Sequence, residues 1–139
     1  MSEFNTQVIE EFRENEGRVG GPFAGAPLLL LHHVGARSGR AQTSPVMYLA
    51  DDDRYLVFAS NGGADQHPAW YHNLRAKPDT EIEVGTDRFA VHAEEITGAE
   101  RDELYARQAR LYPGFAKYQE GTSRVIPVVA LSPAKTAGA

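Results

Sequence analysis

The sequence predicts a mainly β fold, namely a six-stranded antiparallel β-barrel with helices packed on its outside. Six short segments are either continuously apolar or alternate between apolar and polar residues, and hairpin turns join several of them. Only three segments space their apolar residues as a helix does. Strands and helices do not alternate as a doubly wound sheet requires, so the barrel is the favoured architecture.

An amphipathic helix is expected at the N-terminus, where four apolar residues recur at helical spacing: Phe4, Val8, Ile9 and Phe12. We expect this stripe to dock on the domain's own core. A flap over a pocket, or a weak contact with a membrane surface, is the alternative. The chain then divides into an N-terminal helix and linker (1–22), the barrel domain (23–132) and a disordered polar tail (133–139).

Apolar patterning gives the strands. Residues 27–34 are apolar on both alternating faces, which is typical of a strand buried on both sides. Asp51–Asp53 and Gly85–Asp87 supply hairpin turns. Pro127 has no backbone N–H, so the last strand should lie at an edge or contain a bulge. The other strands are expected at residues 43–49, 54–60, 82–84, 89–93 and 125–131.

Two further helices are expected between the strands. Pro68 suits the first position of a helix, and this helix must stop before Pro78. Thr97 and Glu100 have the spacing of a capping box for a helix that reaches about Leu111. The pair Pro113-Gly114 is expected to break this helix, and an aromatic segment with Tyr112, Phe115 and Tyr118 follows.

The composition excludes several classes of protein. A length of 139 residues, 42% of them hydrophobic, fits one globular domain. The chain has no cysteine, which excludes disulfides, thiolate catalysis and cysteine-ligated metal clusters. A formal net charge of -5 argues against a nucleic-acid partner. The local pair Arg37 and Arg40 suits a small anionic ligand instead.

The sequence carries no signal for export or membrane insertion. Its longest apolar run, Ala26–Leu31, is far shorter than the roughly 20 residues that span a bilayer. No basic segment precedes an apolar one near the start, as it would in a signal peptide. We therefore expect a cytoplasmic protein, peripheral to the membrane only if the N-terminal helix reaches the membrane surface.

Several common catalytic motifs are absent. The chain has no glycine-rich nucleotide-binding loop and no serine nucleophile elbow. A metal site is not predicted either. His32 and His33 should point to opposite faces of a strand, and His67 and His72, five residues apart, should lie too far around a helix to share an ion. The histidines are expected to be satisfied surface or core residues.

The turn Gly35-Ala36-Arg37-Ser38-Gly39 can bind an anion. Its two glycines let consecutive backbone N–H groups converge on one point. Arg37 adds a cationic fork and Ser38 adds a hydroxyl donor. The same glycine spacing also occurs in an ordinary hairpin turn, so this motif alone leaves both possibilities open.

Two more features indicate a ligand site. Pro45 should interrupt pairing of its strand, which leaves room for a flat ligand beside the N–H of Val46 or Met47. The pair Gly62-Gly63 precedes the helix that begins near Pro68, and a glycine pair before a helix N-terminus is a second place where an anion can bind.

Together these motifs resemble the deazaflavin-dependent nitroreductases, a family of split β-barrel proteins that use coenzyme F-420. The matching pattern is Gly35-x-Arg37-Ser38-Gly39, Pro45, Ser60-x-Gly62-Gly63-x(4)-Pro68-x-Trp70-Tyr71-x-Asn73-Leu74, Tyr112-Pro113, Tyr118 and Arg124-x-Ile126-Pro127. It covers about residues 28–131. The combination is specific, although no single piece of it is.

The resemblance implies a six-stranded split barrel of the FMN-binding type, with a deazaflavin across its mouth. The implied reaction is hydride transfer from reduced F-420 to a quinone-like or nitroaromatic acceptor. On the substrate side, Phe115 would contact the acceptor and Tyr112 or Tyr118 would donate a proton. The implied cofactor-binding residues are Arg37, Ser38, Gly39, Gln42, Pro45, Val46, Met47, Ser60, Asn61, Gly62, Gly63, Trp70 and Asn73.

Some positions depart from the family pattern. Ala36, Gln42 and Asn61 stand where basic residues are common, which should weaken the hold on an anionic tail, and Phe115 replaces a tyrosine of some relatives. These departures leave a non-catalytic F-420 or quinone-binding protein open as an alternative. An FMN-binding split-barrel protein and a barrel without a ligand are two further alternatives. The sequence is also compatible with either a monomer or a homodimer.

Overall fold

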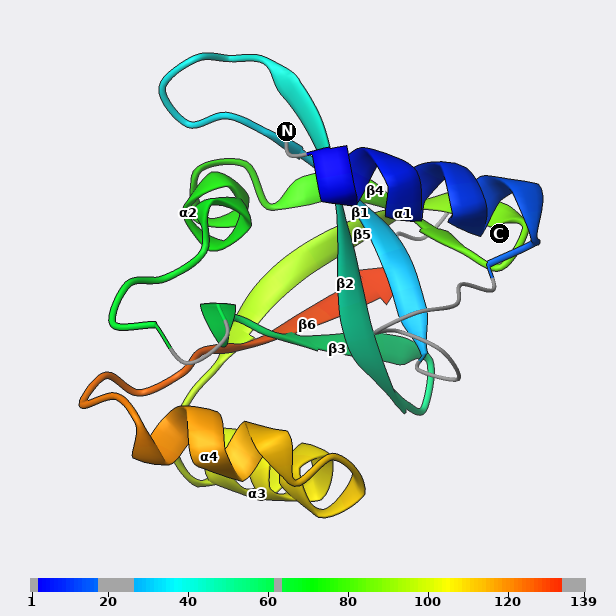
Figure 1. The fold of residues 1–139 in the computed structure, drawn as a ribbon. Coiled ribbons are helices and arrows are strands. Elements are labelled where there is room, and N and C mark those ends of the chain that lie inside the picture. Colours follow the sequence, from blue (N-terminus) through cyan, green and yellow to red (C-terminus); the bar gives the residue numbers. More distant parts are fainter. Residues whose placement is uncertain (1–2, 18–26, 62–63, 134–139) are drawn as a thin grey trace.

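The computed structural model describes residues 3–17, 27–61 and 64–133, which form a closed six-stranded antiparallel barrel with four helices (Figure 1). Around the barrel the strand order is β1-β2-β3-β6-β5-β4, and β4 closes it by pairing with β1. The predicted mainly β barrel is confirmed. In chain order the elements are α1 (Glu3–Glu14), β1 (Leu28–Val34), β2 (Ala41–Asp51), β3 (Arg54–Phe58), α2 (Ala69–Ala76), β4 (Asp79–Val84), β5 (Asp87–Ile96), α3 (Gly98–Leu111), α4 (Gly114–Glu120) and β6 (Val128–Pro133).

The barrel interior is filled by apolar side chains at alternating strand positions. Leu29 and Leu31 of β1, Ile82 of β4 and Val91 of β5 are at most 1% exposed and belong to one cluster. Full burial of each such side chain contributes about 1.5–3 kcal/mol relative to exposure. The alternation that predicts these strands therefore also identifies the main stabilising core.

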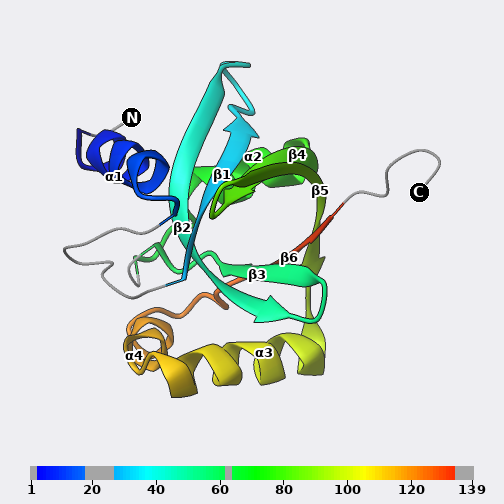
Figure 2. The same cartoon turned by 90° about the vertical axis from the view of Figure 1, so that its right-hand side faces the viewer.

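The helix α1 packs on the outer face of the hairpin formed by β1 and β2, and Figure 2 shows it beside β2. Val8, Ile9 and Phe12 are buried there against Leu28 and Leu30. This packing explains why β1 is apolar on both of its faces. The expectation that the N-terminal stripe docks on the domain's own core is confirmed.

The exposed face of α1 is acidic. It carries Glu10, Glu11 and Glu14, whereas a helix that lies on a membrane surface is usually rich in Lys and Arg on its polar face. Within the described ranges, no helix is long and apolar enough to cross a bilayer. The alternative of a membrane contact through this helix is therefore not supported.

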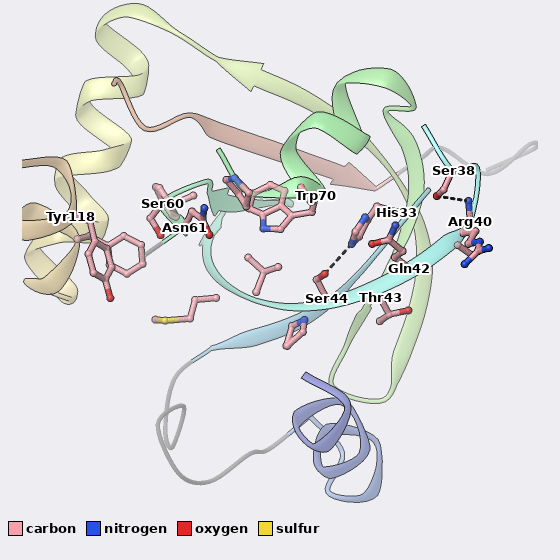
Figure 3. Close-up of a pocket in the computed structure, with 18 residues that line it drawn as sticks. His33, Ser38, Arg40, Gln42, Thr43, Ser44, Ser60, Asn61, Trp70 and Tyr118 are labelled. Atoms are coloured by element: carbon pink, nitrogen blue, oxygen red, sulfur yellow. Dashed lines mark hydrogen bonds between the residues drawn. The ribbon is translucent and has the colours of Figure 1, made fainter. Parts of the chain in front are cut away.

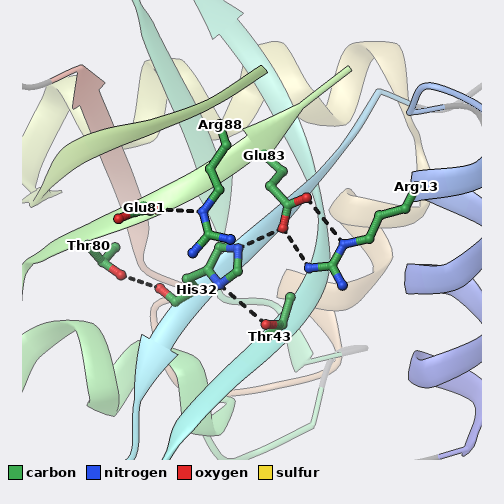
Figure 4. A network of polar contacts seen from close by, with 7 residues as sticks. All are labelled: Arg13, His32, Thr43, Thr80, Glu81, Glu83 and Arg88. Atoms are coloured by element: carbon green, nitrogen blue, oxygen red, sulfur yellow. Dashed lines mark hydrogen bonds and ion pairs between the residues drawn. The ribbon is translucent and has the colours of Figure 1, made fainter. Parts of the chain in front are cut away.

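Polar contacts fix the end of α1 to β4 (Figure 4). The Arg13 guanidinium donates to both carboxylate oxygens of Glu83, at 2.8 and 3.3 Å, and His32 Nε2 lies 2.7 Å from Glu83 Oε2. The hydrogen bond from Arg13 is the main cause of the lowered pKa of Glu83. The Arg13–Glu83 ion pair and the apolar face of α1 thus both fix this helix against the barrel.

The aromatic segment after α3, where no helix was expected, forms the helix α4. Its seven residues are too few for a helix that is stable by itself, so tertiary contacts must hold it. Arg101 of α3 provides them, donating to Gln119 Oε1 (2.6 Å) and to the carbonyl of Ile126 (3.0 Å). These contacts place the aromatic face of α4 against the barrel.

Two local expectations are wrong. The last strand begins at Val128, so Pro127 lies just before the ladder and causes neither an edge nor a bulge within it. Thr97 is the N-cap residue of α3 but makes no side-chain capping hydrogen bond. The partner expected in the capping box, Glu100, instead accepts a hydrogen bond from Arg54 at 3.3 Å.

Candidate functional site

A cavity of about 960 Å³ opens along one side of the barrel (Figure 3). Its walls come from the turn after β1, from β2, from the end of β3 with the loop that follows, and from α2 and α4. Its volume lies within the range of about 300–1,000 Å³ that is common for small-molecule and cofactor sites. The lining residues are His33, Ser38, Arg40, Ala41, Gln42, Thr43, Ser44, Pro45, Val46, Met47, Phe58, Ser60, Asn61, Pro68, Ala69, Trp70, Phe115 and Tyr118.

The cavity follows an unpaired edge of β2. The strand β1 pairs with residues 41–47 of β2, whereas β3 pairs only with residues 48–51. Among the described residues, the second edge of residues 41–47 therefore has no strand partner, and these residues line the cavity. The barrel is closed, but this unpaired edge leaves backbone groups available to a ligand.

Pro45 lies within this open stretch but does not interrupt it, because β2 runs unbroken through the proline. At one end of the β1–β2 hairpin Tyr48 N–H donates to the Pro27 carbonyl (3.1 Å), and at the other Gly35 N–H donates to the Arg40 carbonyl (2.9 Å). Hydrogen-bonded pairs alternate along an antiparallel ladder, so position 45 is one whose N–H would point away from β1. The missing N–H removes no ladder bond.

The same alternation distinguishes Val46 from Met47. Val46 lies two residues from Tyr48 and so directs its N–H toward β1, whereas Met47 directs its N–H toward the open edge. The sequence left both backbone groups open as partners for a flat ligand. The strand register favours the N–H of Met47 as the group that can bond to a ligand at the open edge.

The turn Gly35–Gly39 closes one end of the cavity. Gly39 N–H donates to the Gly35 carbonyl (2.9 Å), and Gly39 has a φ of 70°, which glycine adopts without strain. Ser38 and Arg40 line the cavity, whereas Arg37 is exposed beside it. No carboxylate of the described residues forms an ion pair with either arginine, so both guanidinium groups are available to an anion.

Buried polar side chains hold this turn in place. Asn73, which is 6% exposed, accepts a hydrogen bond from Ala36 N–H at its Oδ1 (2.9 Å), and its Nδ2 lies 2.9 Å from His33 Nδ1. His33 Nε2 in turn lies 2.9 Å from Ser44 Oγ. Burial, and then the neighbouring His32, lower the pKa of His33 to about 4. Asn73 therefore supports the turn from behind the cavity wall.

Arg124 holds the segment that carries Ser60 and Asn61. Its guanidinium donates to the carbonyls of Ala59 (3.0 Å), Ser60 (2.7 Å) and Ala64 (2.8 Å). Three charge-assisted hydrogen bonds to one short stretch of backbone fix its path. Because Ser60 and Asn61 line the cavity, Arg124 shapes one wall without lining it.

Aromatic rings form the opposite end of the cavity from the turn (Figure 3). Phe58 and Phe115 meet edge to face with ring centroids 5.8 Å apart, and Phe115 and Tyr118 do so at 5.3 Å. Tyr118 lines the cavity, whereas Tyr112 caps the end of α3 outside it. Of the two phenols considered as proton donors, only that of Tyr118 lies in the cavity wall.

The premise that His67 and His72 lie on one helix and point apart is wrong, whereas the absence of a predicted metal site is not contradicted. His67 precedes α2 rather than lying on it, and the two ring centroids are 5.7 Å apart. His67 Nδ1 lies 2.9 Å from Arg124 Nη1 and accepts from it. Burial, followed by the charge of Arg124, lowers the pKa of His67. In the part of the chain that the structure describes, no three His, Asp or Glu side chains are grouped to hold a metal ion.

Ten of the residues proposed from the sequence line the cavity. Arg37, Gly39, Asn73 and Tyr112 lie beside or behind its wall, and Gly62 and Gly63 fall outside the described residues. Sequence reasoning missed several neighbours on β2, which alternation around Pro45 could have found. It also missed His33, although this residue continues the inward-facing positions of Leu29 and Leu31. Arg40 and Pro68 also line the cavity; the sequence had singled out Arg40 for an anionic ligand and Pro68 as part of the family motif, without placing either in the site. The lining residues that were missed altogether are His33, Ala41, Thr43, Ser44, Phe58 and Ala69.

Comparison with known proteins gives the family. A sequence profile of the F420H(2)-dependent quinone reductase family matches residues 5–133. The chain belongs to this family. The F-420-dependent oxidoreductase identity that the motifs indicated is thereby confirmed, and coenzyme F-420 is the cofactor that the family implies.

Individual members of the F420H(2)-dependent quinone reductase family agree with this assignment. A protein of Mycobacterium tuberculosis (strain ATCC 25618 / H37Rv) with that name is 42% identical over 127 residues, which cover 87% of this chain and 84% of the relative. A solved F420-H2 Dependent Reductase (FDR-A) is 34% identical with a TM-score of 0.69, covering 76% of this chain and 94% of its own. Another solved structure, described as a domain-swapped dimer, is 32% identical with a TM-score of 0.71, covering 91% and 93%.

Proposed function

We propose that this chain reduces a quinone with reduced F-420, and that the cofactor binds in the cavity along β2. The family and the names of its members support both the cofactor and the acceptor class. The observation of the structure that carries the proposal is the unpaired edge of residues 41–47 inside a cavity. An anion-binding turn lies at one end of this edge and aromatic rings lie at the other.

The residues present fit such a cofactor. The backbone N–H of Met47 is directed to the open edge, where it can bond to a polar atom of a flat ring. Arg40 lies at the turn, where it can bind a phosphate. Gln42 and Asn61 line the cavity as neutral amides, so the charged hold on an anionic tail rests on Arg37 and Arg40.

Bound reduced F-420 supplies the hydride, and the protein supplies position, orientation and exclusion of water. Phe58 and Phe115, both largely buried, make this end of the cavity apolar, which suits an aromatic acceptor. Tyr118 beside them can donate its phenolic proton to the reduced acceptor. No nucleophile or strong general base is required for this chemistry.

The test is anaerobic mixing of the protein with reduced F-420 and menadione, following reoxidation of the cofactor. We expect reoxidation well above the protein-free rate, and a nitroaromatic compound serves as the second acceptor class. Tight F-420 binding without turnover across several quinones would contradict catalysis and support a binding protein. Release of FMN from the purified protein on denaturation would support the FMN alternative.

Arg40→Ala is expected to weaken F-420 binding about tenfold or more, because a charge-assisted hydrogen bond contributes about 1.5–3 kcal/mol. Arg37→Ala is the matched control from the same turn. Arg37 does not line the cavity, so Arg37→Ala should lower the affinity for F-420 only about threefold. This loss should shrink with added salt, because salt screens interactions between exposed charges. Fluorescence titration at low and high salt measures both. Equal losses at high salt would contradict the different roles of the two arginines.

Tyr118→Phe is expected to lower kcat for quinone reduction about tenfold with little change in F-420 affinity, because a positioned acid contributes to rate and water can partly replace it. Tyr112→Phe, outside the cavity, should leave kcat unchanged. Steady-state kinetics with menadione compares the two variants. A larger loss in the Tyr112 variant would show that the wrong phenol was chosen.

We propose a homodimer as the assembly state. The support is the related solved structure described as a domain-swapped dimer, which is 32% identical to this chain. Light scattering after gel filtration tests this, and a monomeric mass at micromolar concentration would contradict it.

A further inference from the structure

A chain of hydrogen bonds runs from the turn to the cavity, and its direction can be derived from its first member. Ala36 N–H can only donate, so the Asn73 atom facing it at 2.9 Å must be the amide oxygen. The Asn73 amide nitrogen therefore faces His33 Nδ1, also at 2.9 Å. An amide nitrogen is a donor only, so Nδ1 must accept.

This direction fixes the state of His33. A ring that accepts at Nδ1 and is neutral carries its proton on Nε2. His33 is 3% exposed, and burial holds its pKa far below neutral, so the neutral ring persists at physiological pH. Nε2–H then donates to Ser44 Oγ, 2.9 Å away.

Ser44 consequently has its own hydroxyl proton left to donate. Its oxygen already accepts from His33, and no acceptor for its proton is found among the residues that the structure describes. Ser44 lines the cavity beside Pro45, so a ligand in the cavity can accept a hydrogen bond from it. Ser44 is partly buried in the cavity wall, so a ligand that displaces water from the cavity can accept this hydrogen bond.

We propose that Ser44 is a ligand-binding residue whose hydroxyl is held as a directional donor by Asn73 and His33, and that it bonds to an uncharged oxygen of the bound cofactor. The proposal rests on the proposed function. An uncharged acceptor is favoured because no cation accompanies the hydroxyl in the hydrogen-bond chain from Ala36 to Ser44. The cations suited to phosphate, Arg37 and Arg40, belong instead to the turn.

The first experiment needs no cofactor. Nitrogen-15 NMR of the His33 ring at pH 7 is expected to show the proton on Nε2 in the wild-type protein. A proton on Nδ1 would reverse the hydrogen-bond chain and overturn the proposal, whatever the protein binds.

The second experiment compares Ser44→Ala, Ser44→Thr and the control Ser132→Ala, which removes an exposed hydroxyl from β6. Each variant is titrated with F-420 and with its deazaflavin–ribityl fragment, which lacks the phosphate and the tail. Ser44→Ala should lower the affinity for F-420 and for the fragment by about five- to tenfold each, as expected for one lost hydrogen bond. Ser44→Thr keeps the hydroxyl and should stay within about twofold, and Ser132→Ala should match the wild type.

The outcomes separate this inference from the proposed function. Unchanged affinity in Ser44→Ala, when the wild-type protein binds F-420, overturns the role of Ser44 and leaves the proposed function intact. A loss seen with F-420 but not with the fragment overturns the uncharged acceptor. Failure of the wild-type protein to bind F-420 overturns the proposed function and the cofactor assignment together, whereas the NMR result still decides the direction of the chain.

Discussion

Between pH 6.5 and pH 4 the protein is expected to lose about 3 kcal/mol of unfolding free energy through His33 alone. Burial is the main cause that lowers the pKa of this side chain from 6.5 to about 4. Within this window the unfolded chain binds a proton at His33 and the folded protein does not. Stability therefore rises with pH through the window and becomes independent of His33 above about pH 6.5.

Urea unfolding of the wild-type protein and of His33→Gln between pH 4 and pH 7.5 measures this effect. Glutamine cannot titrate. The free energy of unfolding of His33→Gln should therefore be lower than that of the wild type at pH 7 but should change less between pH 7 and pH 4. His67, whose pKa burial also lowers, contributes equally to both proteins. Asp51 and Glu83 have pKa values lowered by hydrogen bonds from arginines, so their contributions are lost only below about pH 4.5. Parallel curves would contradict a low pKa for His33.

The fold could be predicted because each strand carries its own pattern. Ile82, Val91 and Ala93 alternate with polar residues and all face the core, and the continuous apolar run of β1 correctly indicated cover on both faces. The helix α4 could not be found in this way. Pro113 and Gly114 look like helix breakers, and the contacts that stabilise α4 come from Arg101, far away in the chain.

The site was only partly accessible to the same reasoning. Local motifs indicated the turn, Pro45 and the aromatic segment, because each of these is a short run of unusual residues. The contact between His33 and Asn73 joins residues 40 positions apart, and neither residue signals the other. The effect of Pro45 depends on whether its position bonds toward β1 or toward the open edge. The pairing register of β1 and β2 cannot be derived from the residue types, so the direction of each N–H is known only from the structure.

Arg124→Ala is expected to lower the unfolding free energy by about 3 kcal/mol and to weaken F-420 binding at least tenfold. The variant removes three charge-assisted hydrogen bonds to backbone carbonyls, each contributing about 1.5–3 kcal/mol before any relaxation. The carbonyl of Ala59, a residue that is fully buried, loses its charged donor. Ser60 and Asn61 then lose the contact that fixes their place in the cavity wall.

Two variants separate the position of this segment from general destabilisation. Arg124→Lys keeps the charge, but a single ammonium group cannot reproduce the fork that reaches three carbonyls, so its losses should be intermediate. Arg88→Ala breaks an exposed ion pair with Glu81 and should cost at most about 1 kcal/mol with no effect on binding. Urea unfolding and fluorescence titration measure both quantities for each variant. If Arg124→Ala lost stability but kept its affinity for F-420, Ser60 and Asn61 would not contact the cofactor, and their place in the proposed site would have to be given up.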